Sequence, residues 1–511
     1  MPSKTIFPQQ KHLGRFISEL RRQKGLTQEE FARRLKTSQS AVARMEKGMQ
    51  NISFEMLMKI SDVLQQNIVH ISQNTASYVV KGGKKLKGEI TTNTSKNGAV
   101  CLMFAALINR GKTILKNVPD IEEVNRIVEL LKSIGVSIAR KGKNMTINTP
   151  LKLKIKNIDT HTARRTRSSI LLLGILSGYL REYTVPSPGG CILGNRTIFP
   201  HIKALEKLGI TINHRHNFYN AKVNLLKKRE VEIIMTERSD LGTVNAILAA
   251  SFRPTTTIIR MASANYQVQE VCVFLSQLGV EIKGIGTHTL IIKGGNFKKD
   301  ISYTLAEDPI ESMLFISAGI MTNSKITIKR CPIDFLLIEI ERLKEMGVGI
   351  EMSSRYKSHN SYTDLVDIKL TKTDNLKSLP IKIEPAPYPG LNIDNLPFFV
   401  PIATKAHGET MIFDWIYENR AIYYTELNKL GANIYLADAH RVFIKGPTPL
   451  HSAEIISPPA LRPAAIILIA MLAARGTSIL RNVYTLNRGY EDICLNLQKI
   501  GADIKIVNKV I

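Results

Sequence analysis

The chain has 511 residues, 44% of them hydrophobic and 22% charged, and its lysines and arginines exceed its acidic residues by 27. That mixture is typical of a globular protein and excludes a fibrous or disordered chain, while the length predicts about three domains. The positive charge favours phosphorylated or polyanionic partners. No apolar stretch reaches the ~20 residues that span a bilayer, and the five cysteines form neither a disulfide framework nor a zinc motif. We therefore expect a cytoplasmic protein without a membrane segment or a metal.

Residues 1–75 are expected to form a separate helical domain. Apolar residues at helical spacing predict four helices there, over 13–24, from 28 onward, from 39 onward and over 53–64. Thr27 and Glu30 have the spacing of a capping box ahead of the second helix, and Ser38 is a typical N-cap for the third. Two short helices joined by the turn at 36–37 are typical of a helix-turn-helix motif.

This stretch, from LRRQKGLTQEEFARRL through SQSAVARMEKG, resembles the helix-turn-helix domain of phage repressors. The resemblance implies that residues 1–75 bind double-stranded DNA, because the second helix of such a motif enters the major groove. Glutamine can read adenine, and arginine can contact phosphate or guanine. The side chains expected to face DNA are Gln28, Gln39, Ser40 and Arg44. A small helical bundle that serves dimerisation or docking is the alternative, and a homodimer through this domain is compatible with both.

Beyond residue 76 a short phrase recurs six times, at intervals of about 70 residues. The copies are LKSIGVSI (131–138), LEKLGITI (205–212), LSQLGVEI (275–282), LKEMGVGI (343–350), LNKLGANI (427–434) and LQKIGADI (497–504). Each copy has the pattern of a helix end, a glycine that stops the helix, and the start of a strand. Strand-like partners precede several copies, at 113–118, 256–262, 325–331 and 477–483. The repeats predict an α/β protein of two lobes, with three mixed β/α units in each.

Two stretches outside the repeat suggest an anion site and a reactive loop. TTNTSKNGAV (91–100) places Lys96 and Asn97 before a helix N-terminus, where a lysine suits an anionic ligand. A solvated lysine is the alternative. SPGGCILGNR (187–196) indicates a flexible loop that presents Cys191, with Arg196 close behind, whereas a buried and inert cysteine is the alternative.

Further stretches supply a carboxylate and three arginines. APYPGLNIDNLP (386–397) carries Asp394, which is either a functional acid or a helix cap. YENR, ALR and NRGYED place Arg420, Arg462 and Arg488 near element boundaries, where most arginines are simply solvated. Each of these patterns alone is weak evidence.

Together with the six repeats, the motifs SKN, PGGC…G-x-R, YPG…D, ENR and NRGYE resemble the enolpyruvyl transferases, most closely those that act on UDP-N-acetylglucosamine. The resemblance runs from about residue 78 to the end of the chain. It implies a two-lobed inverse α/β barrel of six repeated β/α units, preceded by the small all-α helix-turn-helix domain. The implied boundaries are 1–75 for the helix-turn-helix domain, 97–307 for the first lobe, and 76–96 with 308–511 for the second lobe.

The resemblance also implies an activity, the transfer of the enolpyruvyl group of phosphoenolpyruvate to the 3-hydroxyl of UDP-N-acetylglucosamine with release of phosphate. This is the first committed step of peptidoglycan precursor synthesis, and no metal or organic cofactor is implied. Phosphoenolpyruvate carries a phosphate and a carboxylate, which planar arginines bind bidentately. The implied catalytic residues are Cys191, Asp394 and Lys96, and the implied substrate-binding residues are Asn97, Arg167, Arg196, Arg238, Ile416, Arg420, Arg462 and Arg488.

Each implied residue has a role by the same resemblance. Asp394 would accept the hydroxyl proton as general base, and Cys191 would protonate C3 of phosphoenolpyruvate or form an adduct. Asn97 would bond to the sugar, and Arg167 would support the loop that covers the site. The phosphate would be held by Lys96, Arg196 and Arg488, and the carboxylate by Arg420 and Arg462.

Several positions depart from the family pattern. Ala460 stands where an aspartate of the proton relay is usual, Phe199 lies in a stretch that usually binds uridine, and Pro309 replaces a hinge arginine. Asn265, Tyr266 and Gln267 replace a usual Glu-Pro-Glu. Two alternatives therefore stay open. One is a transcriptional regulator whose barrel senses a UDP-sugar or phosphoenolpyruvate without turnover; the other is the sister family that acts on shikimate 3-phosphate, which lacks the PGGC loop and ENR.

Overall fold

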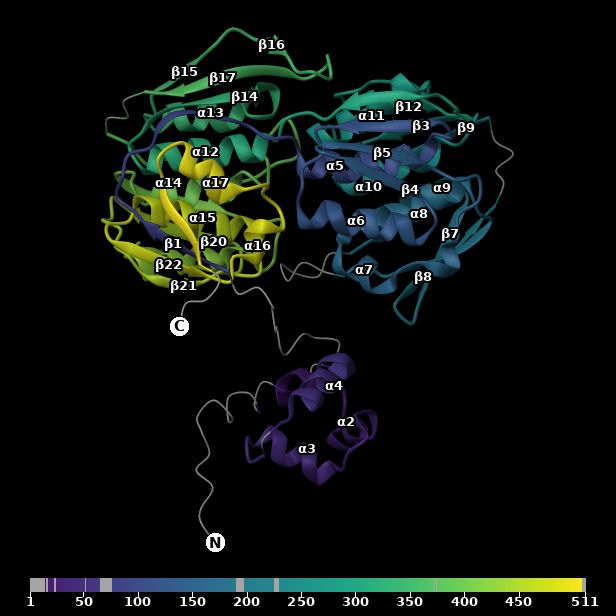
Figure 1. Ribbon diagram of the computed structural model, residues 1–511, viewed down its shortest axis with the longest axis horizontal. Coiled ribbons are helices and arrows are strands. Elements are labelled where there is room, and N and C mark those ends of the chain that lie inside the picture. Colours follow the sequence, from purple (N-terminus) through teal and green to yellow (C-terminus); the bar gives the residue numbers. More distant parts are fainter. Residues whose placement is uncertain are drawn as a thin grey trace. The chain divides into compact units, whose positions relative to one another are not determined.

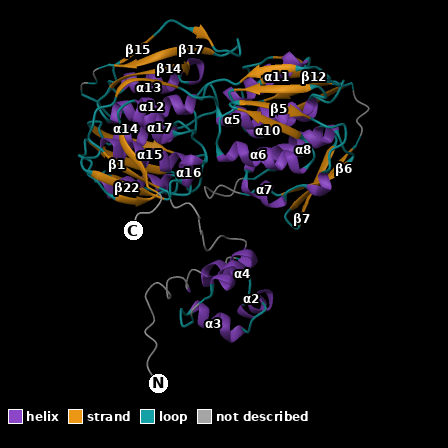
Figure 2. Ribbon diagram, viewed as in Figure 1, coloured by secondary structure: helices purple, strands orange, loops and turns teal. Residues whose placement is uncertain are grey.

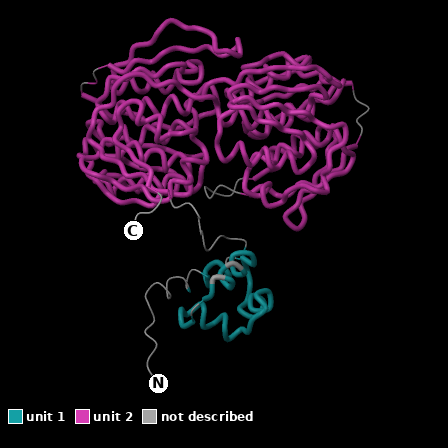
Figure 3. Tube along the Cα trace, viewed as in Figure 1, with its two compact units in different colours: residues 1–74 teal, residues 75–511 magenta. Residues whose placement is uncertain are grey.

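The chain forms two compact units, residues 1–74 and residues 75–511 (Figure 3). The structure is a computed structural model, and each unit is described by itself. The residues that it describes are 14, 17–22, 24–50, 52–64, 76–189, 197–224, 229–371, 373 and 375–507.

The smaller unit is helical, as predicted. Its complete helices are α2 (Gln28–Leu35), α3 (Gln39–Glu46) and α4 (Phe54–Leu64), and residues 17–22 are also helical. The predicted capping box is confirmed, because the Thr27 amide donates to Glu30 Oε2 at 2.8 Å and the Glu30 amide donates to Thr27 Oγ1 at 3.2 Å. Ser38 caps α3 through the amide of Ala41. The side chains buried between these helices include Ile17, Leu20, Phe31, Leu35, Val42, Met45, Ile60 and Leu64.

In the larger unit the described strands form six sheets, three from residues 112–304 and three from the rest (Figure 2). In the first of these sheets the strand order is β13 (Ile301–Thr304), β3 (Lys112–Lys116), β5 (Asn144–Asn148) and β4 (Ser137–Lys141). In the second it is β6 (Glu182–Pro186), β8 (Phe218–Val223) and β7 (Ile210–Arg215). In the third it is β11 (Glu281–Lys283), β12 (Thr289–Lys293), β10 (Thr256–Arg260) and β9 (Glu230–Ile234).

The other three sheets take in the first two strands of this unit. In the fourth sheet the strand order is β21 (Glu454–Ile456), β22 (Thr477–Arg481), β1 (Ser77–Lys81) and β23 (Asp503–Val507). In the fifth it is β15 (Ile350–Met352), β17 (Asp364–Leu370), β14 (Lys325–Pro332) and β2 (Lys87–Thr91), and β16 (Tyr356–Lys357) pairs with β17. In the sixth it is β18 (Gly408–Phe413), β20 (Arg441–Gly446) and β19 (Ile434–Leu436). β1 therefore lies beside the last strands of the chain, which are yellow in Figure 1.

Helices fill the space inside these sheets, and strands lie toward the outside (Figure 2). The helices are α5 (Lys96–Ala105), α6 (Glu122–Ser133), α7 (Thr160–Arg165), α8 (Leu172–Ile175), α9 (Phe199–Lys207), α10 (Asp240–Ala250), α11 (Tyr266–Leu278), α12 (Pro309–Met321), α13 (Leu337–Glu345), α14 (Phe399–Ala403), α15 (Leu461–Ala473), α16 (Tyr484–Asn487) and α17 (Ile493–Lys499). α12 is buried along its whole length, and nearly all of α15 is, which is expected of helices that are apolar on every face.

All six copies of the repeated phrase have the predicted structure. Each ends a helix, passes through a glycine with positive φ and enters a strand; in the fifth copy the helix is the 3₁₀ helix η7 (Ala421–Leu430). The φ values run from 76° at Gly209 to 118° at Gly279, in the left-handed region where a side chain is strained. The predicted inverse α/β barrel of six units is thus confirmed.

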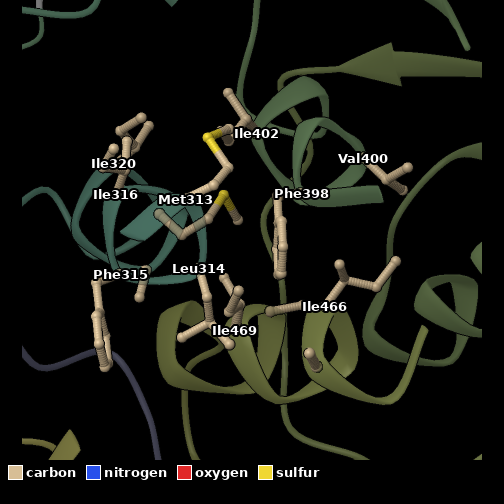
Figure 4. Close-up of a cluster of buried hydrophobic side chains, with 14 of the residues drawn as sticks. Met313, Leu314, Phe315, Ile316, Ile320, Phe398, Val400, Ile402, Ile466 and Ile469 are labelled. Carbon is tan, nitrogen blue, oxygen red and sulfur yellow. The ribbon is translucent and has the colours of Figure 1, made fainter. Parts of the chain in front are cut away.

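The larger unit has two separate apolar cores. One draws its buried side chains from residues 99–305, and the other from 310–504 together with 78–90 and Tyr266. In the second core, Leu314 of α12 faces Ile469 of α15 (Figure 4). The two cores support the proposed first lobe and second lobe, and these names are kept below.

Candidate active site

Asp394 lies on a loop that a buried glutamate holds in place. The loop precedes the 3₁₀ helix η6 (Leu396–Phe398). Glu339 of α13, only 2% exposed, accepts from the Asn392 amide at 3.0 Å and from Asn395 Nδ2 at 2.8 Å. The Asp394 amide donates to Asn392 Oδ1 at 2.9 Å. The N-cap of η6 is Asn395 and no side chain caps this helix, so Asp394 is not a helix cap and its carboxylate projects from a fixed turn.

Two arginines of the second lobe approach this carboxylate. Arg462, in the first turn of α15, donates from Nη2 to Asp394 Oδ2 at 3.3 Å and from Nη1 to the Tyr490 hydroxyl at 2.6 Å. Arg420 Nη1 lies 3.9 Å from Asp394 Oδ1. Burial alone would raise the pKa of Asp394, but the charges of Arg462, Arg420 and Lys96 hold it below its ordinary value. The carboxylate is thus ionised at neutral pH and can accept a proton.

Arg420 is held by a carboxylate that the sequence analysis missed. It is 1% exposed, and its Nε and Nη2 donate to the two oxygens of Asp414 at 2.6 and 2.9 Å. The Tyr424 hydroxyl donates to Asp414 at 2.6 Å, and Arg420 Nη2 also donates to the Ile393 carbonyl at 2.9 Å. These bonds fix the guanidinium and leave its Nη1 edge toward Asp394. Apart from lying six residues before Arg420, Asp414 carries no sequence signal of this role.

Lys96 and Asn97 are the first two residues of α5, in the first lobe. The helix begins at Lys96, so both residues lie in its first turn and not before it as predicted, and the Ser95 hydroxyl caps it by accepting from the Gly98 amide at 3.0 Å. Lys96 Nζ donates to Glu123 Oε2 at 2.9 Å. Asn97 Nδ2 donates to the Tyr266 hydroxyl at 2.8 Å. Both side chains are therefore oriented before any substrate binds.

Arg488, in the second lobe, lies next to the Lys96–Glu123 pair of the first lobe. Its carbonyl accepts from the Glu123 amide at 3.4 Å. Burial alone would raise the pKa of Glu123, but the charges of Lys96 and Arg488 hold it below its ordinary value. Arg488 Nε is buried and has no hydrogen-bond partner among the described residues. An anion between Lys96 and Arg488 would find two cations on facing segments.

The remaining predicted residues lie apart from this cluster or outside the description. Cys191 and Arg196 are outside the described residues. Arg167 begins a 3₁₀ helix (Arg167–Leu171) and donates from Nη2 to the Thr197 carbonyl at 3.4 Å. Arg238 is exposed in the loop before α10, and Ile416 is 39% exposed in the turn after β18. Within the described ranges, no hydrogen bond or ion pair joins these three side chains to Asp394.

The departures from the family pattern have a partial structural explanation. Ala460 is the N-cap residue of α15 and provides no side-chain cap, so no carboxylate precedes Arg462 there. Asp308 caps α12 through the Ile310 amide at 2.9 Å, and it is close enough to Arg462 for its charge to raise the pKa of that guanidinium. The sequence did not predict that Asp308 lies near Arg462, because an aspartate before a proline at a helix start is expected to be only a cap. Glu339 is an acid on an otherwise apolar helix face, and that pattern could have predicted a buried hydrogen-bonding role for it.

Within the described part of the chain, clusters of metal ligands and membrane-spanning helices are both absent. No group of three or more His, Cys, Asp or Glu residues there could hold a metal ion. No described helix is both long and apolar enough to cross a bilayer.

In the smaller unit, three of the four predicted DNA-facing side chains are exposed on α3. These are Gln39, Ser40 and Arg44. Arg44 Nε donates to Gln50 Oε1 at 3.3 Å, a bond at the surface that DNA can replace. Gln28 is instead half-buried and donates to Glu46 Oε2 at 2.9 Å.

Glu46 also forms a buried ion pair with Arg21, whose Nε donates to Glu46 Oε1 at 2.5 Å. The Ser18 hydroxyl donates to the other oxygen of Glu46 at 3.0 Å. Gln28 therefore belongs to a network that ties the first three helices together, and reading a base with its amide would require it to leave Glu46.

Comparison with known proteins agrees with this geometry. Residues 80–497 match the family described as EPSP synthase (3-phosphoshikimate 1-carboxyvinyltransferase), and residues 17–71 match the helix-turn-helix family. The chain belongs to the enolpyruvyl transferase (carboxyvinyltransferase) family and carries a helix-turn-helix domain at its N-terminal end.

Among curated relatives, the chain is similar to the UDP-N-acetylglucosamine 1-carboxyvinyltransferase of Borrelia garinii subsp. bavariensis, at 33% identity over 84% of this chain and 99% of the relative. It is 31% identical to the enzyme of the same name from Treponema denticola, over 84% of this chain and 99% of that one. Among solved structures, the enolpyruvyl transferase NikO from Streptomyces tendae superposes with a TM-score of 0.72 at 23% identity, covering 85% of this chain and 99% of that chain. An EPSP synthase from Acinetobacter baumannii gives 0.66 at 18% identity, covering 85% of this chain and all of that chain. These two structures establish the fold.

Proposed function

We propose that the larger unit transfers the enolpyruvyl group of phosphoenolpyruvate to the 3-hydroxyl of UDP-N-acetylglucosamine and releases phosphate. The observation that carries the proposal is the placement of Asp394, an ionised carboxylate between Arg462 and Arg420 that also feels the charge of Lys96. The acceptor follows from the names of relatives that match over 84% of this chain.

The reaction is an addition followed by an elimination. The acceptor oxygen bonds to C2 of phosphoenolpyruvate while C3 gains a proton; C3 then loses a proton as the phosphate leaves. In this proposal Lys96 and Arg488 bind the phosphate, and Arg462 with the Nη1 edge of Arg420 binds the carboxylate. Asp394 accepts the hydroxyl proton. The proton for C3 is assigned to Cys191, and Arg196 to the phosphate, by the family resemblance.

Phosphate release from phosphoenolpyruvate in the presence of UDP-N-acetylglucosamine tests this proposal. Asp394→Asn keeps the shape of the side chain but removes the base, so turnover should fall by about 10²–10⁴-fold. Asp438→Asn is the control, because the ion pair of Asp438 is with the exposed Arg441, three residues further along the chain. Release that does not depend on the sugar, or that survives Asp394→Asn, would exclude this mechanism. Shikimate 3-phosphate replaces the sugar in a parallel assay, and turnover with it alone would identify the sister activity instead.

A second candidate is a regulator that binds DNA and senses a UDP-sugar or phosphoenolpyruvate without turnover. The helix-turn-helix unit, with Gln39 and Arg44 exposed on α3, favours it. Saturable ligand binding without any phosphate release would support this candidate over the transferase.

DNA binding itself is proposed under both candidates. Two copies of residues 1–75 in a homodimer would read half-sites about one helical turn apart. Gln39→Ala should lower affinity for a selected target by about 1–3 kcal/mol, while Arg44→Ala should also weaken random duplex if it contacts phosphate. Fluorescence anisotropy with labelled duplexes at two salt concentrations measures both. With these substrates and a DNA partner, we also propose that the protein acts in the cytoplasm.

A further inference from the structure

Two chain segments connect the first and second lobes, and they are bonded to each other. The Ser95 amide donates to the Ala306 carbonyl at 2.8 Å, and the Asp308 amide donates to the Asn93 carbonyl at 2.9 Å. Thr94 and Glu307 form an antiparallel bridge between these bonds. The segment at 93–95 runs directly into Lys96, so the geometry of this hinge sets the position of the start of α5.

Glu270 of α11 contacts both sides of that start. Its side chain is 3% exposed, and its Oε1 accepts from the Ala306 amide of the hinge at 2.6 Å. Its Oε2 lies against Gly98 so closely that a Cβ on residue 98 would be 2.1 Å away. This buried oxygen has no hydrogen-bond partner among the described residues. A glutamate is thus wedged between the second hinge segment and the first turn of α5.

The same face of α11 also holds Asn97. Tyr266 precedes Glu270 by four residues, so the two side chains share one face of the helix. The Tyr266 hydroxyl accepts from Asn97 Nδ2 at 2.8 Å. Asn97 and Gly98 are therefore both fixed by α11, and Lys96 immediately precedes them.

We propose that Glu270 is a positioning residue for the transfer reaction, which fixes the start of α5, with Lys96 and Asn97, against the hinge. The inference rests on the proposed function of that site. Glu270 touches no substrate in this proposal; it acts through the placement of Lys96 and Asn97.

The protonation state of Glu270 matters for this role. Burial raises its pKa to about 8, and the charges of Glu307 and Asp308 on the hinge add to the shift. Cys101 of α5 and Tyr303 of β13 are the other titratable groups close enough to feel its charge. At neutral pH Glu270 is therefore uncharged. Above about pH 8 it gains a negative charge beside two other carboxylates, which should loosen the hinge contact.

Two variants of the full-length chain test the proposal. Glu270→Gln cannot ionise but keeps an oxygen for the Ala306 amide, whereas Glu270→Ala removes the wedge. At pH 7 we expect Glu270→Gln to keep the wild-type KM for phosphoenolpyruvate within about threefold, and Glu270→Ala to raise it about tenfold or more. Between pH 7 and pH 9 the KM of the wild type should rise more than that of Glu270→Gln. Because Cys191 and Asp394 are the same in both proteins, that difference reports Glu270 alone.

The outcomes separate this inference from the proposed function. Absence of sugar-dependent phosphate release by the wild type would refute the function. Calorimetric titration with phosphoenolpyruvate, repeated at pH 7 and 9, would then test the inference by the same comparison. An unchanged KM or Kd in Glu270→Ala, or equal pH dependence in wild type and Glu270→Gln, would overturn it. Melting temperatures of all variants show whether a change in binding is only a loss of folding.

Discussion

The two sides of the candidate active site are built differently. On the second lobe, Asp394 and Arg420 belong to networks that close within that lobe, through Glu339 and Asp414 respectively. On the first lobe, Lys96 is oriented by Glu123 of α6 and by a helix start that depends on the hinge.

This difference indicates which half of the site is fixed in advance. Asp394 and Arg420 keep their arrangement whatever the hinge does, because the side chains that hold them lie in the same lobe. Lys96 and Asn97 of the first lobe change position when the hinge does, because they begin the helix that directly follows it. We therefore expect changes in the second-lobe networks to affect folding as well as catalysis, and changes near the hinge to affect substrate binding first.

The largest effect is expected from Asp414→Asn. It removes the closest ion partner of the buried Arg420 guanidinium, which should lower the free energy of unfolding of the larger unit by about 3–5 kcal/mol. Chemical denaturation, followed by circular dichroism, measures the loss. The double variant Asp414→Leu/Arg420→Met is the matched control: it should recover much of the stability and none of the activity. Full stability in Asp414→Asn would mean that this network is not what holds the second-lobe side.

Gly98→Ala tests the first-lobe side. The new methyl group would meet Glu270 Oε2 at 2.1 Å, so the Glu270 side chain or the start of α5 must move, and a displacement of Lys96 and Asn97 by about 1 Å can cost on the order of 100-fold in kcat/KM. Steady-state kinetics with phosphoenolpyruvate measures the change. Gly319→Ala serves as a control, because there the methyl group meets the flexible end of Leu370 at 2.4 Å, far from the hinge. Equal kinetic losses in both variants would argue against a special role for the α5 start.

A pH-dependent stability is expected from two buried glutamates that bond to the hinge, Glu270 at the Ala306 amide and Glu311 at the Asn93 amide. Burial raises the pKa of Glu270 and of Glu311 to about 8 each. Their contribution to stability is complete below about pH 4.5 and is lost as the pH rises to about 8, since only the unfolded chain releases the protons in that interval. Between pH 6.5 and 8 each should cost about 1–2 kcal/mol.

Two buried bases oppose this trend at the edges of the window. His201, whose pKa burial lowers to about 3, still titrates in the unfolded chain near pH 6.5, and Lys405, whose pKa burial lowers to about 8, titrates in the folded chain at the upper edge. Both are unchanged in Glu311→Gln, so their effects cancel when that variant is compared with the wild type. Melting temperatures of wild type and Glu311→Gln, measured across pH 6.5–8, check the prediction. Parallel curves for the two proteins would contradict it.

The smallest effect is expected from Glu123→Gln, which frees Lys96 from its ion partner. The Lys96 and Glu123 side chains keep 14% and 17% of their surface exposed, so water can replace part of the lost pairing. The gain in phosphoenolpyruvate affinity should therefore be below about 1 kcal/mol, or about fivefold. Isothermal titration calorimetry measures it, with Glu129→Gln on the exposed face of the same helix as control. Weaker binding in Glu123→Gln would show instead that Glu123 is needed to place Lys96.

Much of the fold was predictable from local patterns. The six glycines with positive φ, the strands beside them and the capping box at Thr27 and Glu30 each depend on a few neighbouring residues. Short-range sterics and capping hydrogen bonds impose those structures wherever the pattern occurs. The motif residues Asp394, Arg462, Lys96 and Arg488 could be proposed together only through a family resemblance, because they are up to 392 positions apart (from 96 to 488).

The supporting residues could not be predicted in the same way. Asp414 resembles any other aspartate until folding buries it against Arg420, and Glu270 resembles a helix glutamate until Gly98 and Ala306 close around it. Gln28 was expected to face DNA, yet packing directs its amide to Glu46.

The sequence by itself therefore determined the repeated β/α units, the helix-turn-helix and the identity of the charged groups, since these follow from local conformational preference and residue chemistry. Only the tertiary structure decided which carboxylate neutralises which cation and which acid stays protonated at the hinge. Burial and long-range proximity set those pairings, and neither is encoded in any short stretch of the chain.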